Sequence, residues 1–192
     1  MLTRNDAALD FLQTRRSRPA KTLVAPAPTR EELIPILTAG ARTPDHGMME
    51  PFRFIVVEKG AMARLATLTE EAGARLGKSA EDIAKARSQF DLGHLAVVVV
   101  EVQKDSPKIP PIEMTYTAGA VCLSLLNAAL ASGWGANWLS GWMSHDPTFR
   151  EAAFGLETHE RIAGIVHIAT EGPVPPERPR PDLDQITTWV EA

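Results

Sequence analysis

The chain has 192 residues, 44% of them hydrophobic, with 24 acidic against 20 basic side chains and a formal net charge of -4. This length suits a single compact domain over residues 1–192, and the acidic balance argues against a general binder of nucleic acid or anionic membranes, which normally carries a basic excess. The only cysteine, Cys122, excludes an intrachain disulfide. Together with an N-terminal segment that carries no readable secretory signal, this composition predicts a cytoplasmic protein.

The first 75 residues predict a helix, a second helix, a strand and a third helix, over residues 5–16, 29–42, 52–59 and 61–75. Asn5 is suited to cap the first helix, which ends in two arginines. Thr29 and Glu32 form a capping box at the start of the second helix, and Pro35 inside it should cost a hydrogen bond or kink the helix. The strand segment, FRFIVVEK, is rich in β-branched and aromatic residues.

The middle of the chain is its most apolar part. Residues 95–102, LAVVVVEV, form a continuous apolar run that is typical of a strand covered on both faces. Residues 114–145 contain no Asp, Glu, Lys or Arg, but their apolar stretch is interrupted by Ser124 and Asn127 and is shorter than the roughly 20 residues of a membrane span. We therefore expect a buried helix over residues 112–132, whose small side chains also suit a tight subunit contact.

The remaining elements complete an α+β domain. Residues 135–141 predict a short strand, residues 146–155 a helix with Asp146 as its N-cap, and residues 161–170 the last central strand. Because long helices separate the strands, the order predicts a three-layer α/β/α fold with a central mixed sheet. Residues 172–192 hold five of the 15 prolines and should form an extended arm, whose apolar end needs a surface to cover.

Motifs for several other chemistries are incomplete. Gly133 and Gly135 begin a G-x-G pattern, but Trp138 occupies the place of the third glycine of a dinucleotide-binding loop. The sequence HERIA has Ala163 where a zinc protease needs its second histidine, and the five histidines have no ligand spacing, so we expect no metal site. Neither a P-loop nor a GxSxG nucleophile elbow is present in the sequence.

Two segments carry polar groups that suggest a binding site. Arg15, Arg16 and Arg18 surround Ser17, and this combination of guanidinium and hydroxyl groups is typical of phosphate recognition. Residues 41–54, ARTPDHGMMEPFRF, place a Pro-Asp-His-Gly turn between a helix and a strand. From these residues alone, a solvated helix end and an ordinary polar turn remain open alternatives.

Four segments, taken in order along the chain, resemble the nitroreductase family and within it the small YdjA-like branch. They are Arg15 to Ser17, RTPDHGMMEPF at 42–52, NWLSG at 137–141 and GIVHIAT at 164–170. The resemblance implies a nitroreductase-like fold in a domain-entwined homodimer, with FMN at the subunit interface and both chains contributing to each site. The arm of residues 172–192 would then reach the partner subunit.

The resemblance also implies roles for individual residues, all of them in binding FMN. Arg15, Arg16 and Ser17 would grip the ribityl phosphate and the flavin edge. Arg42 and His46 would reach the FMN that is held mainly by the other subunit. The residues that line the flavin near its polar tail would be Trp138, Leu139 and Ser140. No side chain is expected to act as an acid or base, because the hydride chemistry belongs to the flavin.

The sequence departs from the family pattern at two positions. Leu139 stands where close relatives often have Arg, so the phosphate would depend more on the arginines at 15 and 16. Glu50 stands where the family has Gln, and a carboxylate near an anionic reduced flavin is unfavourable, so this residue is left outside the expected site.

The function implied by the resemblance is an NAD(P)H-dependent flavin oxidoreductase. FMN is the expected cofactor, NADH or NADPH the reductant, and a nitroaromatic, a quinone or a similar small molecule the acceptor in a ping-pong cycle. One alternative is an FMN-binding storage or sensing module without turnover. Another is a helical interaction protein without a cofactor, in which the basic segment is a solvated helix end.

Overall fold

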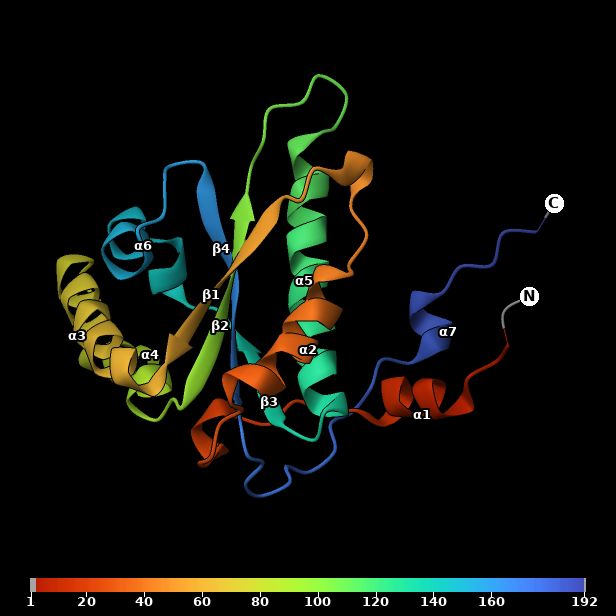
Figure 1. Cartoon of the computed structure of the whole chain (residues 1–192), viewed down its shortest axis with the longest axis horizontal. Helices are drawn as coiled ribbons and strands as arrows, with labels where there is room; N and C mark the ends of the chain where they lie inside the picture. The colour runs from red at the N-terminus through yellow and green to blue at the C-terminus, as the bar shows by residue number, and fades with distance from the viewer. Residues whose placement is uncertain (1–2, 192) are drawn as a thin grey trace.

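The computed structural model describes residues 3–191 as an α/β body from which two terminal segments extend (Figure 1). The strands are β1 (Phe52–Glu58), β2 (Leu95–Val102), β3 (Gly135–Leu139) and β4 (Glu160–Ala169). The helices are α1 (Asp6–Thr14), α2 (Arg30–Ala41), α3 (Lys59–Arg75), α4 (Ala80–Asp91), α5 (Pro111–Ala131), α6 (Pro147–Phe154) and α7 (Leu183–Ile186). Short 3-10 turns are η1 (Ala20–Thr22), η2 (His46–Met48) and η3 (Trp142–His145).

The sheet has the strand order β1-β2-β4-β3, and β4 is central as expected. Every strand pair within residues 3–191 is antiparallel, so the expected mixed sheet is wrong for the described chain. The reason lies in the connections. Two helices, α3 and α4, connect β1 to β2, so that β2 starts at the end of the sheet where β1 finished and runs in the opposite direction. A single helix, α5, connects β2 to β3, and these two strands run in the same direction. They do not pair with each other, because β4 lies between them and is antiparallel to both.

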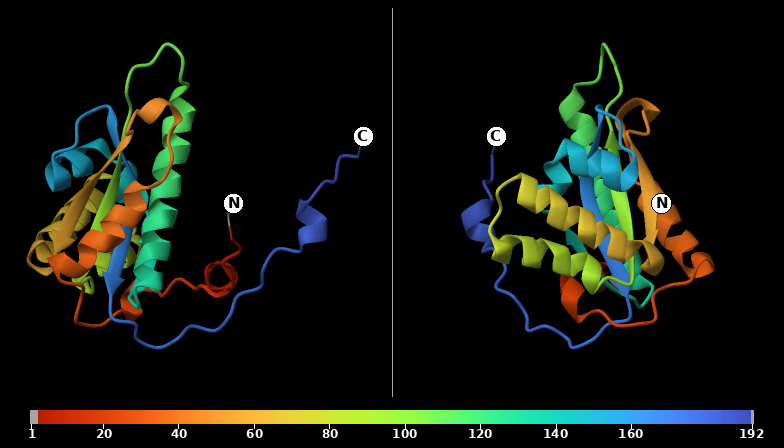
Figure 2. Two further views of the ribbon diagram at one scale, coloured as in Figure 1. Left: turned by 45° about the vertical axis from the view of Figure 1, so that its right-hand side comes forward. Right: turned by 90° about the vertical axis from the view of Figure 1, so that its left-hand side faces the viewer.

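Helices cover both faces of the sheet, which confirms the three-layer architecture (Figure 2). On one face, α3, α4 and α6 enclose a core that includes Met62, Phe90 and Phe149. On the other face, α2 and α5 enclose a second core that includes Ile36 and Leu125. Strand β2 contributes to both cores through alternate valines, which is why its sequence is a continuous apolar run rather than an alternating one.

Local capping signals fix most helix starts. The Thr29–Glu32 capping box is present with both of its hydrogen bonds, and α2 continues through Pro35. Asp146 caps α6, where its carboxylate accepts the Phe149 N–H at 2.8 Å. Helix α4 was missing from the sequence prediction, although Ser79 caps it by accepting a hydrogen bond from the Asp82 N–H.

Helix α5 is long and apolar enough to cross a membrane by length and hydropathy alone. In the structure it packs against α2, β2, β3 and β4, and its inner face is buried. Its outer face is different, because the apolar side chains of Ile112, Tyr116 and Leu123 are exposed, Tyr116 by 67%. The expected buried helix is thus confirmed for one face, and the other face is an apolar row on the surface.

The segment after β4 leaves the body of the domain (Figures 1 and 2). Residues 172–181 are extended, α7 adds one short turn, and the following residues are again without regular structure. The apolar side chains at its end are exposed, with Trp189 84% accessible. We call residues 172–191 the arm.

Candidate phosphate-binding site

The arginine-rich segment is attached to the free edge of β3 by two hydrogen bonds to the Arg18 main chain. The Arg18 N–H donates to the Ala136 carbonyl at 2.8 Å, and the Asn137 side-chain amide donates to the Arg18 carbonyl at 2.9 Å. The Arg18 guanidinium also pairs with Glu171 at 2.6 Å. Helix α1 ends at Thr14, and the three residues before Arg18 have no regular secondary structure.

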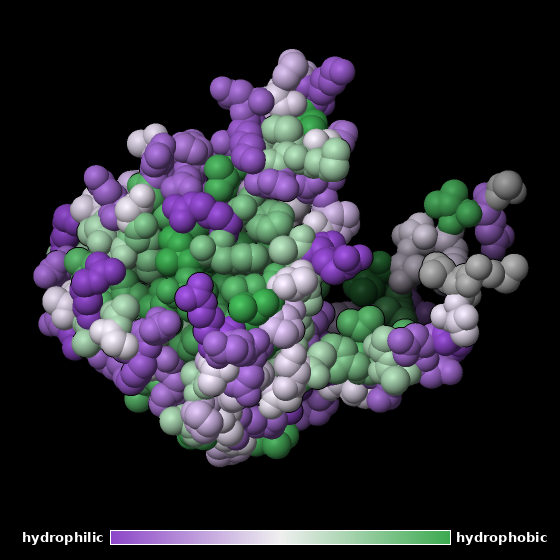
Figure 3. All heavy atoms as spheres, in the orientation of Figure 1, coloured by the Kyte–Doolittle hydropathy of each residue, from purple (hydrophilic) through white to green (hydrophobic). Residues whose placement is uncertain are grey.

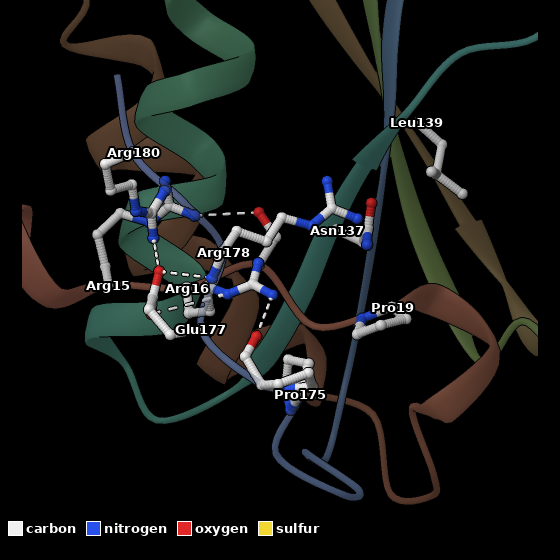
Figure 4. A pocket seen from close by; sticks show the side chains of 11 residues that line it. Arg15, Arg16, Pro19, Asn137, Leu139, Pro175, Glu177, Arg178 and Arg180 are labelled. Carbon is white, nitrogen blue, oxygen red and sulfur yellow. Dashed lines mark hydrogen bonds and ion pairs between the residues drawn. The ribbon is translucent and has the colours of Figure 1, made fainter. Parts of the chain in front are cut away.

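A cavity of about 680 Å³ opens where this segment, strand β3 and the arm meet (Figure 4). The segment contributes Arg15, Arg16, Ser17 and Pro19, and β3 contributes Asn137 and Leu139; the arm contributes Pro175, Pro176, Glu177, Arg178 and Arg180. Four guanidinium groups and a single carboxylate therefore line it. The chemistry of this lining suits an anion with apolar neighbours.

The two arginines at the centre of the cavity have unused hydrogen-bond donors. The Nε atoms of both Arg15 and Arg16 are buried and have no hydrogen-bond partner. Burial and then the neighbouring charges, Arg180 first, lower the pKa of Arg15. Arg15 also donates to the Ser17 hydroxyl at 3.0 Å, which orients both groups. A buried donor without an acceptor costs about 1 to 3 kcal/mol, so an anionic acceptor at this position would be strongly favoured.

The arm is held against this cluster by its own contacts. Arg16 donates through Nη2 to the Pro176 carbonyl at 2.6 Å. Glu177 pairs with Arg180 at 2.6 Å and lies 3.9 Å from Arg16 Nε, beyond hydrogen-bond length. Sequence reasoning did not place Arg178, Arg180 or Asn137 in the site. The one available signal was the charged sequence ERPR inside a proline-rich arm, which does not reveal that the arm folds back on the cluster.

The side chains of residues 137–139 point alternately to the two faces of strand β3. Asn137 and Leu139 line the cavity, whereas Trp138 does not. Trp138 packs over Gly164 of β4, where a Cβ atom would lie 2.0 Å from the indole Nε1. Ser140 follows the strand, is exposed and does not line the cavity. Of the expected residues after Gly135, the cavity thus includes Leu139 alone.

Arg42 and His46 lie at another part of the molecule. Arg42 follows the end of α2 and is exposed, and the His46 ring is 2.6 Å from the Glu113 carboxylate in the first turn of α5. The cavity lies near the opposite end of α5, and a helix of 21 residues is about 30 Å long. Within one chain these two residues do not join the arginine cluster, as is expected if they serve the site of a second chain.

The loop that carries His46 has an unusual backbone. Gly47, Met48 and Glu50 all have positive φ angles, of 70°, 51° and 46°. The last two are not glycines, and this conformation is uncommon for other residues. The Asp45 carboxylate accepts the Glu50 N–H and so closes the loop. The loop presents Met48 to solvent, and Glu50 is also exposed.

Comparison with known proteins agrees with the fold. Residues 12–170 match the sequence profile described as "Nitroreductase family". The chain belongs to the nitroreductase family. This nitroreductase-family chain is 36% identical over 163 residues to the Escherichia coli K12 protein named "Putative NAD(P)H nitroreductase YdjA", covering 85% of the chain and 87% of the relative. The resemblance noted in the sequence is therefore confirmed.

Solved structures show the same architecture for this nitroreductase-family chain. A nitroreductase-like family protein from Bacillus cereus superposes with a TM-score of 0.78 at 23% identity and covers 100% of both chains. A structure from Desulfovibrio desulfuricans, described as a "putative nitroreductase in complex with fmn", superposes with a TM-score of 0.77 at 20% identity and covers 98% of this chain and 99% of the other. The nitroreductase-like fold is thus established.

Proposed function

We propose that this nitroreductase-family protein is an FMN-dependent NAD(P)H oxidoreductase. The observation that carries the proposal is the pair of buried, unpartnered Nε donors of Arg15 and Arg16, two of the four arginines that line the cavity. When bound, FMN supplies hydride transfer from NADH or NADPH to a nitroaromatic, quinone or similar acceptor in a ping-pong cycle. The relatives' names and the FMN complex of a structural neighbour support the same assignment.

The residues of the cavity fit the phosphate end of FMN. Arg15, Arg16 and Ser17 would hold the dianionic phosphate, and Arg178 and Arg180 of the arm add two further cations. A hydrogen bond to a charged group contributes roughly 1.5 to 3 kcal/mol, so two or three such bonds suffice for a non-covalent cofactor.

We further propose that each site is completed by a second copy of the chain. Arg42 and His46 are too far from the arginine cluster of their own chain and would contact the FMN held by the partner. The apolar row on α5 and the exposed side chains at the end of the arm are the surfaces that such a dimer would cover. Apolar surface also gathers over the edge strand β1 (Figure 3). Obligate interfaces of this kind bury roughly 2,000 to 5,000 Å².

Trp138 and Ser140, the expected site residues of β3 and its end that do not line the cavity, would contact the flavin only in the proposed dimer. Trp138 and Ser140, with Leu139, would line the flavin where the two chains meet, although only Leu139 faces the cavity of a single chain. We also propose a cytoplasmic location, because a chain with a single cysteine, Cys122, has no intrachain disulfide that would need an oxidising compartment.

Spectroscopy of the purified protein tests the proposed function directly. The full chain should be yellow, or become so with added FMN, and NADH or NADPH should bleach the flavin band under anaerobic conditions; an acceptor panel should then restore the band. Protein that takes up no FMN would refute the proposal. A bound flavin that neither nicotinamide reduces would instead identify a storage or sensing module.

A further inference from the structure

Glu177 is the one carboxylate among the residues that line the cavity. It pairs with Arg180 at 2.6 Å, and its other oxygen faces the unpartnered Nε of Arg16 at 3.9 Å. In Figure 4 the side chains of Arg16 and Arg180 converge on it. The carboxylate thus occupies part of the volume in which an anionic ligand would meet the guanidinium groups.

The contacts of Glu177 differ from those of the cavity's other polar groups. Arg15, Arg16 and Ser17 are partly buried, and the segment that carries them is bound to β3 through Arg18, whereas the Glu177 side chain is 64% exposed and belongs to the arm. An exposed ion pair is worth little and is easily exchanged for another anion. A phosphate dianion offers more acceptors to the same donors than one carboxylate does. Glu177 can therefore be displaced, while the arginines stay in place.

We propose that Glu177 is an internal counter-anion for the flavin site. In the flavin-free protein its carboxylate neutralises part of the arginine cluster, and the incoming phosphate must displace it or be repelled by it. The proposal rests on the proposed function, because the competing anion is the phosphate of FMN. It predicts that this acidic residue lowers the affinity for the cofactor, even though it lies inside the binding site.

The test is a fluorescence titration of flavin-free, full-length protein with two ligands that differ only in the phosphate. FMN and riboflavin are titrated into the wild-type chain, Glu177→Gln, and Asp184→Asn. The last variant removes the same charge from the arm at an exposed residue that does not line the cavity. Circular dichroism verifies that all three proteins share one fold.

Glu177→Gln should bind FMN about three- to tenfold more tightly than the wild type, a gain that shrinks as salt screens the charges. Its riboflavin affinity should not change, and Asp184→Asn should match the wild type with both ligands. An FMN affinity that is unchanged or weaker in Glu177→Gln would overturn the inference alone, as would an equal gain for riboflavin. A wild-type chain that binds neither flavin would overturn the proposed function together with the inference.

Discussion

Arg16 is the residue through which the two walls of the cavity meet. Its Nη2 binds the arm at the Pro176 carbonyl, while its buried Nε has no hydrogen-bond partner. An arginine side chain can serve both because its donors point in fixed and separate directions. The residue therefore positions the arm with one donor and keeps another for a ligand.

The arginine pair gives the first prediction at this scale. The double variant Arg15→Ala/Arg16→Ala should lose FMN while it stays folded and dimeric, because each charge-assisted bond is worth about 1.5 to 3 kcal/mol, or roughly ten- to hundredfold in affinity. Flavin content after gel filtration and the FMN dissociation constant measure the effect. Lys21→Ala is the matched control, since Lys21 is exposed and does not line the cavity. Stoichiometric flavin in the double variant would show that the phosphate binds elsewhere.

His167 gives a prediction on pH dependence. It is buried in β4 beside the Phe90 ring, and burial lowers its pKa from 6.5 to about 4. Below pH 6.5 the imidazole of His167 takes up a proton in the unfolded state but stays neutral in the folded state. The contribution of the neutral imidazole to the free energy of unfolding is therefore fully present above pH 6.5 and is lost as the pH falls towards 4. The loss approaches about 1.4 kcal/mol per pH unit between these values.

Urea unfolding at several pH values between 7 and 4 measures this loss. The wild type should lose stability more steeply than His167→Leu over this range, since the variant has no imidazole to titrate. Both proteins keep Glu160 and Asp146, whose lowered pKa values act at lower pH, so the difference between the two curves isolates His167. Parallel curves would mean that the imidazole is not held neutral by the fold.

At the scale of elements, the contact between β3 and β4 fixes the orientation of the residues beside the cavity. Gly164 leaves the space that the Trp138 indole fills, and any side chain there meets the ring. Because alternate residues of a strand face opposite sides, fixing Trp138 on one face turns Asn137 and Leu139 to the cavity on the other. A glycine outside the cavity thus helps to determine which side chains line it.

Gly164→Ala should lower the free energy of unfolding by about 1 to 3 kcal/mol, the usual cost of overpacking, and should shift the tryptophan emission. Chemical denaturation and fluorescence spectra measure both effects. Gly60→Ala, in α3, is the control because a Cβ atom there meets nothing within 4 Å, and it should leave stability nearly unchanged. Equal stability of the two variants would contradict the tight packing of Trp138.

In the proposed dimer, the arm is the element whose role depends most on the second chain. Deleting residues 181–192 keeps Arg178 and Arg180 but removes the apolar end, and should weaken the dimer and lower its thermal midpoint. Replacing Ile186, Trp189 and Val190 by Ser in the full chain should have the same effect if burial of these side chains is the cause. Unchanged sedimentation and thermal midpoints in both variants would refute the docking of the arm.

At the scale of the whole molecule, the proposed two-chain assembly accounts for both the apolar row on α5 and the separation of His46 from the arginine cluster. Leu123→Glu places a charge in the middle of that row and should shift the protein towards monomers, because burying an unpaired carboxylate is costly. Analytical ultracentrifugation over a concentration series measures the shift. Leu76→Glu, another exposed leucine, at the end of α3, should remain dimeric. A dimer equally stable in both variants would place the interface elsewhere.

The fold was predictable where its causes are local. The capping box at Thr29, the cap at Asp146 and the apolar run of β2 each depend on a few neighbouring residues, and all are confirmed. The sequence prediction omitted α4 and therefore gave the wrong direction for β2 relative to β1. A connection of one helix favours parallel strands, whereas the two helices α3 and α4 return the chain for an antiparallel pair. Arg15 and Arg16 were predicted from composition and resemblance, but the arm's return to them, 160 positions later, depends on tertiary contacts that no local pattern encodes.

The attachment of the arginine segment to the sheet also sets an order of events during synthesis. Arg18 leaves the ribosome early, yet it is held by Asn137 and Glu171, which lie 119 and 153 positions later. At 5 to 20 residues per second, the segment waits on the order of ten seconds before its docking surface exists. A nascent chain therefore has no cavity until β4 has emerged, and loading of a cofactor follows translation of almost the entire described chain.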